Sequence, residues 1–202
     1  MRGTRPLSNG ELRIIADCFD GEFAIRDKSL ILIGVSTGGR ISELLALTLG
    51  DVYQNDKPVE TLHFNKDVVK GKENSRTVPV NSDGVKAISD LIHWHVEYYG
   101  NIDPQRPCFP SRQKRKGEQV SITRQRAHQV FKDVCEKAGL NGNLATHSLR
   151  KSYAQRLYVI LSDVFSVKEM LGHQDVKTTQ AYLGVDVEKV RKASEAMTIG
   201  NQ

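Results

Sequence analysis

The stretch that most restricts what this chain can fold into runs from residue 147 to residue 182. His147 and Arg150 are three residues apart, so a helix would present both side chains on one face, where they can meet a single anion. His173 follows 23 residues after Arg150, directly past Gly172, a residue type that readily ends helices. Tyr182 comes nine residues later, in what reads as the next short helix.

A second motif, TGGRISELLAL, lies upstream and contains Arg40. The apolar segment 26–37 reads as a buried helix that ends at the glycine pair 38–39, and a further helix begins at Ile41. Arg40 is therefore expected at a rigid corner between two helices. Taken alone, the R-x-x-E motif favours a surface arginine that pairs with Glu43 or Asp51, and only the downstream motifs favour a functional role.

The motifs TGGRISELLAL, HSLRKSYAQRL and LGHQDVKTTQAY together resemble those of the tyrosine recombinase (phage integrase) family. The resemblance extends from about Leu7 to about Leu183. It rests on the order and spacing of the three motifs, because a single H-x-x-R motif would be weak evidence. It implies a mixed, mainly α fold with a small antiparallel β-sheet, the catalytic-domain fold of that family. We expect a linker or arm at 1–7, the catalytic domain at 8–184, and a C-terminal tail helix at 185–202 that is exchanged between protomers.

Hydrophobic periodicity and turn residues locate the remaining elements. Helices are expected from residue 8, at 83–99, at 123–138, from 147, and after Asp163 or Ser166. Short strands are expected at 60–64, 68–69 and 76–80, and a loop at 100–112 that ends in a short strand near Phe109. In the helix from 147, Thr146 is the expected cap, and Leu149, Tyr153, Leu157 and Ile160 form the expected buried stripe.

The resemblance assigns catalysis to Arg40, Lys70, His147, Arg150, His173 and Tyr182. In that assignment the Tyr182 hydroxyl attacks a DNA phosphate to give a 3′-phosphotyrosyl link. The two arginines and His173 would stabilise the transition state, while His147 accepts the tyrosine proton. A lysine on the hairpin of the small sheet would protonate the leaving 5′-oxygen, and Lys72 remains the alternative to Lys70 in this role.

The densest positive charge lies between residues 104 and 132. It reads as a loop and a helix start that contact phosphates, or alternatively as a solvated loop. The predicted DNA-binding residues are Arg112, Lys114, Arg115, Lys116, Arg124 and Arg126. A formal net charge of +5 suits a polyanionic partner without requiring one.

Several classes of protein fit the sequence poorly. The three cysteines are widely spaced and form no C-x-x-C pair, which argues against a disulfide framework or a zinc site. We expect no cofactor and no metal, because the chain has neither a GxxxxGK[ST] loop nor an acidic set at metal-binding spacing. The longest apolar run, 30–35, is too short to span a bilayer, and no signal peptide is evident, so a cytoplasmic location is expected.

Site-specific DNA recombination of the integration and excision kind is the leading functional interpretation. The alternatives are a short DNA invertase that acts as a phase-variation switch, and a non-catalytic DNA-binding regulator on the same fold. An N-terminal core-binding domain, usual in the family, is not expected before Leu7, so the chain reads as an excised fragment or a minimal enzyme. The target site and the host element cannot be deduced from the sequence.

The expected partner is double-stranded DNA, with no membrane association and with accessory DNA-bending proteins as additional partners. An apolar stripe recurs every three or four residues in the tail and comprises Val187, Val190, Ala193 and Met197. The stripe could pack in its own domain, or cross to a neighbouring protomer as the resemblance implies. We expect a monomer when the protein is free and a homotetramer on paired DNA sites.

Overall fold

The computed structural model describes residues 3–65, 75–183 and 187–197 of the chain. Within these ranges the fold is mainly helical with small antiparallel strand pairs, which confirms the predicted fold class. The helices are α1 (Asn9–Ala16), α2 (Ala24–Thr37), α3 (Ile41–Leu44), α4 (Leu49–Val52), α5 (Ser82–Tyr99), α6 (Arg124–Lys137), α7 (His147–Leu161), α8 (Val164–Leu171), α9 (Val176–Leu183) and α10 (Val187–Ala196). The strands are β1 (Tyr53–Gln54), β2 (Lys57–Pro58), β3 (Thr61–Phe64), β4 (Arg76–Pro79), β5 (Pro110–Arg115) and β6 (Glu118–Ser121).

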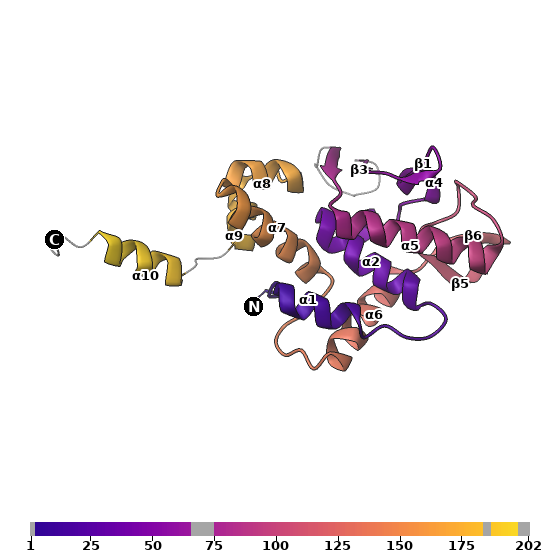
Figure 1. Ribbon diagram of the computed structural model, residues 1–202, viewed down its shortest axis with the longest axis horizontal. Helices are drawn as coiled ribbons and strands as arrows, with labels where there is room; N and C mark the ends of the chain where they lie inside the picture. The colour runs from indigo at the N-terminus through magenta and orange to yellow at the C-terminus, as the bar shows by residue number, and fades with distance from the viewer. Residues whose placement is uncertain (1–2, 66–74, 184–186, 198–202) are drawn as a thin grey trace.

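Helix α2 forms the centre of the domain. Its middle is apolar on all sides, as expected of a helix buried within a core, and Leu30 and Ile31 belong to two different hydrophobic clusters. Figure 1 shows α2 running beside α5, with α7 nearby. Gly84 permits the close approach of α5, because a Cβ at that position would lie 2.8 Å from the Cβ of Ser36. The C-terminal end of α2 is thereby held firmly in the core.

Strands β3 and β4 pair in antiparallel register, with Leu62 opposite Val78 and Phe64 opposite Arg76. These four residues are the buried positions of the two strands, and their neighbours are exposed. The alternation follows the two-residue period of a half-buried sheet. The strand predicted at 68–69 lies outside the described residues.

The region predicted as a basic loop contains a β-hairpin, so this part of the prediction was wrong. Strands β5 and β6 pair around a two-residue turn, with Arg115 opposite Glu118. Lys116 and Gly117 occupy the turn with φ angles of 51° and 85°. Two consecutive residues with positive φ suit the right-handed twist of a hairpin, and glycine tolerates this conformation well.

Helix α7 begins at His147 as predicted, but two details of the prediction were wrong. Thr146 has α-helical backbone angles and its side chain caps nothing; instead, the Ser148 hydroxyl accepts a hydrogen bond from the backbone N–H of Ala145. Leu149 is buried as expected, whereas Ile160 is 77% exposed. The buried stripe therefore does not extend to the last turn of the helix.

The C-terminal part of the described chain contains α8, α9 and α10. Asp163 caps α8, and Gly172 ends it in a left-handed conformation with a φ of 66°. Helices α8 and α9 pack on α7 through a small cluster that includes Val167 and Leu171. Helix α10 lies within the predicted tail, and Figure 1 shows it projecting away from the other helices. No helix in the described ranges is long and apolar enough to cross a membrane.

Candidate active site

Arg40 follows the corner at the end of α2. Gly38 adopts a left-handed conformation with a φ of 64°, and a side chain there would collide with the ring of Tyr153. A Cβ at Gly39 would lie 2.7 Å from a methyl carbon of Leu44. The two glycines are therefore required by backbone angle and by space. Arg40 leaves this corner as the N-cap of α3.

Glu43 fixes Arg40 and is itself held by Arg76. The backbone N–H of Arg40 donates to one carboxylate oxygen of Glu43 at 2.6 Å, and its guanidinium donates to the other at 3.0 Å. Arg76 donates to both oxygens, at 2.6 and 2.7 Å. Burial acts to raise the pKa of Glu43, but the hydrogen bonds and charge of Arg76 outweigh it and hold that pKa below its ordinary value.

The sequence interpretation missed Arg76. The position of Arg76 in the strand could have revealed its burial, because β4 buries alternate residues and Arg76 shares the buried face with Val78. A buried arginine requires a carboxylate or another acceptor. In the structure that acceptor is Glu43. The Arg76–Glu43 contact therefore ties strand β4 to the corner that carries Arg40.

Arg150 lies in the first turn of α7 and is 1% exposed. Its guanidinium donates to the backbone carbonyl of Gly38 at 2.6 Å and to that of Leu171. Its Nε–H is buried and has no partner among the described residues. Burial, followed by the charges of Arg40 and Arg76, lowers the pKa of Arg150 to about 10. The guanidinium is therefore rigidly placed and surrounded by like charge that a bound anion would neutralise.

Tyr182 and His147 meet although 35 residues separate them. The Tyr182 hydroxyl lies 2.6 Å from Nε2 of His147, and the two rings meet edge to face with centroids 5.1 Å apart. Burial and then the charges of Arg150 and Lys151 lower the pKa of His147 below its ordinary value. The imidazole is therefore largely neutral at pH 7 and can accept a proton from the phenol.

His173 also meets Tyr182 edge to face, with ring centroids 5.0 Å apart. Its Nδ1 is 2.9 Å from the hydroxyl of Thr179, while its Nε2 is buried and has no partner in the described part of the chain. Burial and then the charge of Arg150 lower the pKa of His173 to about 3. Thr179 is fully buried and fixes the ring, a role that the sequence interpretation did not assign.

The structure thus brings together five of the six residues predicted to be catalytic. Direct contacts join Tyr182 to both histidines, and electrostatic coupling joins Arg150 to Arg40 and to Tyr182. The Nε–H of Arg150 and Nε2 of His173, which have no partner among the described residues, can therefore interact with an anion beside the tyrosine. Lys70 and Lys72 lie outside the described residues.

The six predicted DNA-binding residues lie on two neighbouring elements and are all exposed. They are Arg112, Lys114 and Arg115 on β5, Lys116 in the hairpin turn, and Arg124 and Arg126 in the first turn of α6. The hairpin leads directly into α6, whose first turn is capped by the Thr123 side chain. The positive charge is thus displayed on a rigid hairpin and a helix start.

The described residues contain no group of three or more histidine, cysteine, aspartate or glutamate side chains placed to hold a metal ion. Cys18, Cys108 and Cys135 are free thiols in the structure. The five predicted catalytic residues that the structure describes are cationic or neutral, a set suited to an anionic substrate.

Comparisons with known proteins agree with this geometry. The chain matches the phage integrase family over residues 7–189. Tyrosine recombinase XerD of Mycobacterium leprae (strain TN) is 32% identical over 176 residues, which cover 86% of this chain and 52% of the relative. Tyrosine recombinase XerC of Xylella fastidiosa (strain 9a5c) is 34% identical over 178 residues, with coverage of 88% and 54%. The chain therefore spans about half the length of these relatives.

Two solved structures are similar in fold. The XerH site-specific recombinase, in a post-cleavage complex with palindromic difH substrate, matches with a TM-score of 0.73 and 25% identity, covering 96% of this chain and 53% of XerH. The XerA recombinase matches with a TM-score of 0.73 and 20% identity, covering 98% of this chain and 66% of XerA. The second likeness concerns the fold alone.

A mainly helical domain that brings together a tyrosine, two histidines and two arginines is similar to the catalytic domains of tyrosine recombinases. The chain belongs to the phage integrase family.

Proposed function

We propose that this chain cleaves and rejoins DNA through a covalent 3′-phosphotyrosyl intermediate on Tyr182, in site-specific recombination of the integration and excision kind. The observation that carries the proposal is the 2.6 Å contact between the Tyr182 hydroxyl and Nε2 of His147. This contact gives the phenol a neutral base at hydrogen-bonding distance, as nucleophilic catalysis by a hydroxyl requires.

In the proposed cleavage step, the phenolic oxygen of Tyr182 attacks phosphorus while His147 accepts the phenolic proton. The bond between phosphorus and the 5′-oxygen breaks, leaving a 3′-phosphotyrosyl ester and a 5′-hydroxyl. Rejoining reverses these steps with a 5′-hydroxyl from the partner strand. Because one phosphodiester is exchanged for another, the reaction consumes no high-energy cofactor.

The transition state carries extra negative charge on the nonbridging oxygens. In this proposal the charge is stabilised by Arg40 and by the Nε–H of Arg150, which has no partner among the described residues. If the Thr179 hydroxyl donates to Nδ1 of His173, then Nε2 of His173 carries a proton and provides a third donor. Glu43 positions Arg40 and transfers no proton in this scheme.

We assign protonation of the leaving 5′-oxygen to Lys70, with Lys72 as the alternative. Both precede β4, and Arg76 at the start of β4 reaches Glu43. A lysine beside the leaving 5′-oxygen would supply the proton that an alkoxide leaving group needs.

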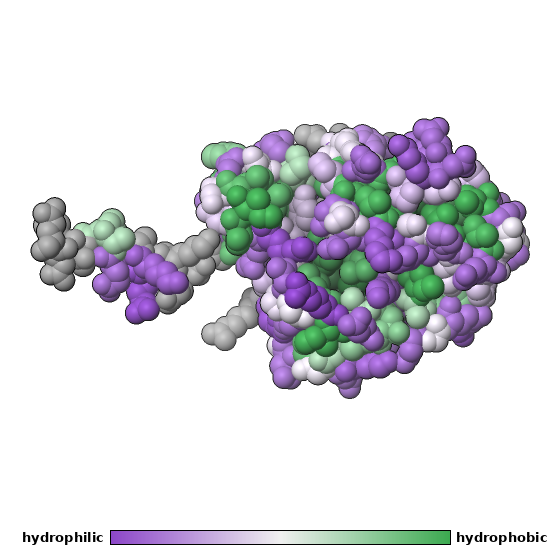
Figure 2. Space-filling model, in the orientation of Figure 1, coloured by the Kyte–Doolittle hydropathy of each residue, from purple (hydrophilic) through white to green (hydrophobic). Residues whose placement is uncertain are grey.

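Assembly on DNA is also part of the proposal. We propose that four protomers form a complex on paired sites and that the tail containing α10 docks on a neighbouring protomer. Figure 2 shows a hydrophobic area near the end of the molecule where α7 and α8 lie. Four large hydrophobic residues of α7 and α8 are exposed, namely Val159, Ile160, Leu161 and Phe165. An apolar surface of this kind suits a protein contact.

The test is capture of DNA by the protein from a pool of nicked duplexes with randomised sequence. Cleavage of a nicked strand releases a short fragment, so that rejoining fails and the covalent complex accumulates. We expect DNA that stays attached to the protein in SDS, and a common sequence among the captured molecules. Paired copies of this sequence in direct and inverted orientation then distinguish excision from inversion. Binding without any covalent capture would instead identify a DNA-binding regulator.

A further inference from the structure

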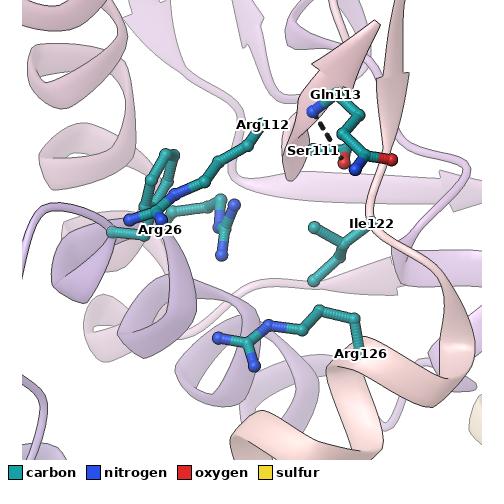
Figure 3. Close-up of a pocket in the computed structure, with 7 residues that line it drawn as sticks. Arg26, Ser111, Arg112, Gln113, Ile122 and Arg126 are labelled. Atoms are coloured by element: carbon teal, nitrogen blue, oxygen red, sulfur yellow. Dashed lines mark hydrogen bonds between the residues drawn. The ribbon is translucent and has the colours of Figure 1, made fainter. Parts of the chain in front are cut away.

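A second cationic pocket lies at the opposite end of α2 from Arg40. It has a volume of about 380 Å³ and is formed by the start of α2, strand β5 and the start of α6 (Figure 3). Three arginines line it, one from each element: Arg26, Arg112 and Arg126. Phe23 and Ile122 complete its apolar wall. Three elements distant in sequence thus direct positive charge to one cavity.

Arg26 forms the fixed, buried part of this pocket. It is 3% exposed, pairs with Asp27 at 2.7 Å, and donates to the carbonyl of Pro110 at 2.7 Å. Its guanidinium also stacks on Phe23, with the central carbon 4.3 Å from the ring centroid. These contacts hold the start of β5 against α2, so the wall of the pocket is rigid before any ligand binds.

The other two arginines are less fully neutralised. Arg112 stacks 4.7 Å from the same Phe23 ring and pairs with Glu22 at 3.0 Å, but both side chains are largely exposed. Such a surface ion pair contributes little and can be exchanged at small cost. The Arg126 guanidinium has no ion pair or hydrogen bond in the described part of the chain. Its positive charge contributes to lowering the pKa of Arg26. The pocket therefore has positive charge in excess of its carboxylates.

The shape and donors favour a phosphate group. Planar guanidinium groups give paired, charge-assisted hydrogen bonds to phosphate oxygens, and the Ser111 hydroxyl and Gln113 amide add neutral donors at the rim. We propose that this pocket binds a phosphodiester of the DNA backbone, distinct from the phosphate that Tyr182 attacks. The proposal rests on the proposed function, because it takes DNA as the ligand.

The position of the pocket on α2 gives this contact a role. From Arg26 to Thr37 the helix advances about 17 Å, at 1.5 Å per residue, and Arg40 lies beyond that end. One DNA strand advances about 3.4 Å per nucleotide along the duplex axis, so a phosphate in the pocket lies several nucleotides from the reacting one. The buried helix then acts as a rigid spacer that sets which phosphodiester reaches Tyr182.

The experiment is a scan in which single phosphates of the captured duplex are replaced by neutral methylphosphonates. Affinity is measured for Tyr182→Phe, which cannot become attached, and for the same protein carrying Arg126→Gln or Arg112→Gln. Lys132→Gln is the matched control, because it removes an exposed charge from α6 without lining the pocket. Thermal unfolding of each variant confirms that the fold is retained.

We expect one phosphate, several nucleotides from the cleaved position, whose neutralisation weakens binding about ten-fold when Arg126 is present and less than about two-fold in Arg126→Gln. Lys132→Gln should keep the full ten-fold effect at that phosphate. The proposal would be overturned if the effects of Arg126→Gln and of phosphate neutralisation on affinity were additive at every phosphate. It would also be overturned if Arg126 were coupled to the cleaved phosphate itself. If the pocket binds a protein carboxylate instead, no phosphate will couple to Arg126. Affinity is measured without cleavage, so the two proposals can fail separately. If a phosphate is coupled to Arg126 but no DNA is captured covalently, the pocket proposal is retained and the recombinase reaction is rejected.

Discussion

The hydroxyl of Tyr182 and Nε2 of His147 lie 2.6 Å apart although they belong to α9 and α7. The contact depends on α8, which packs against both helices and carries Leu171, whose carbonyl accepts from Arg150. Tyr182, His147 and Arg150 are therefore positioned by one small helical unit. A change that loosens α8 should disturb all three together.

The first prediction concerns acid stability and His173. The pKa of His173 is about 3 in the folded protein, against an ordinary value of about 6.5 in an unfolded chain. Above about pH 6.5 neither state binds this proton, whereas between about 6.5 and 3 only the unfolded state does. The free energy of unfolding should therefore fall with decreasing pH, by up to about 1.4 kcal/mol per pH unit from this residue.

Urea unfolding at pH 7, 6 and 5 checks this, with His173→Gln expected to show a shallower decrease than the wild type. His93→Gln is the control, because the His93 ring is exposed and its hydrogen bond within the described residues is to the carbonyl of Ser89. Equal decreases in the wild type and His173→Gln would mean that burial of His173 does not oppose its protonation.

The second prediction concerns Arg76. Arg76→Gln leaves the buried Glu43 carboxylate without its bidentate partner, which should cost about 3 kcal/mol of stability. The Glu43→Gln and Arg76→Gln double variant should lose less than the sum of the single variants. Lys86→Gln breaks the exposed pair with Asp90 and should cost less than about 1 kcal/mol.

Because Glu43 also fixes Arg40, Arg76→Gln should slow covalent attachment to saturating DNA by about 100-fold while affinity stays within about two-fold. Arg76→Lys should recover part of this rate. A loss of affinity with an unchanged rate would show that Arg76 contacts DNA and does not position Arg40.

The fold and most of the site could be predicted from the sequence, for identifiable reasons. The apolar run in α2, the glycine pair before Arg40 and the glycine before His173 fix local structure through burial and backbone angle, and all three predictions are confirmed. The approach of Tyr182 to His147 could be inferred only from the family resemblance, because no local rule relates residues 35 apart.

Other features were missed because they depend on pairing between segments. Charge dominated the interpretation of 104–132, so the turn at Lys116 and Gly117 was overlooked and a hairpin was taken for a loop. Arg76 was not recognised because its importance comes from Glu43, which lies 33 residues earlier. Helical periodicity alone predicts that Ile160 is buried. The residue is exposed because it lies in the last turn of α7, beyond the part of the helix that packs on other elements.

The third prediction concerns the hairpin acid. Lys70→Ala should greatly reduce cleavage of ordinary DNA, by about 100-fold or more, because the 5′-oxygen then leaves without a proton. Replacing that oxygen with sulfur should restore cleavage, since a thiolate leaves unaided. Lys72→Ala should have little effect on either substrate. Loss and rescue in Lys72→Ala instead would assign the acid to Lys72.

The fourth prediction concerns the tail. Deleting residues 186–202 should leave DNA binding by one protomer nearly unchanged and should abolish the complex of four protomers on paired sites. Native gels and light scattering on the two forms measure this. Undiminished tetramers from the shortened protein would rule out an exchanged tail, and unfolding of that protein would show that the tail packs within its own domain.

The fifth prediction concerns the nucleophile and is the most direct test of the reaction. After capture of a nicked duplex, digestion and mass spectrometry should locate the DNA adduct on the peptide containing Tyr182. Tyr182→Phe should bind the same duplex with affinity within about two-fold and form no adduct, because the lost hydroxyl is the attacking group. An adduct that persists in Tyr182→Phe, or that maps to Tyr153 or Tyr158 in the wild type, would contradict the role assigned to Tyr182.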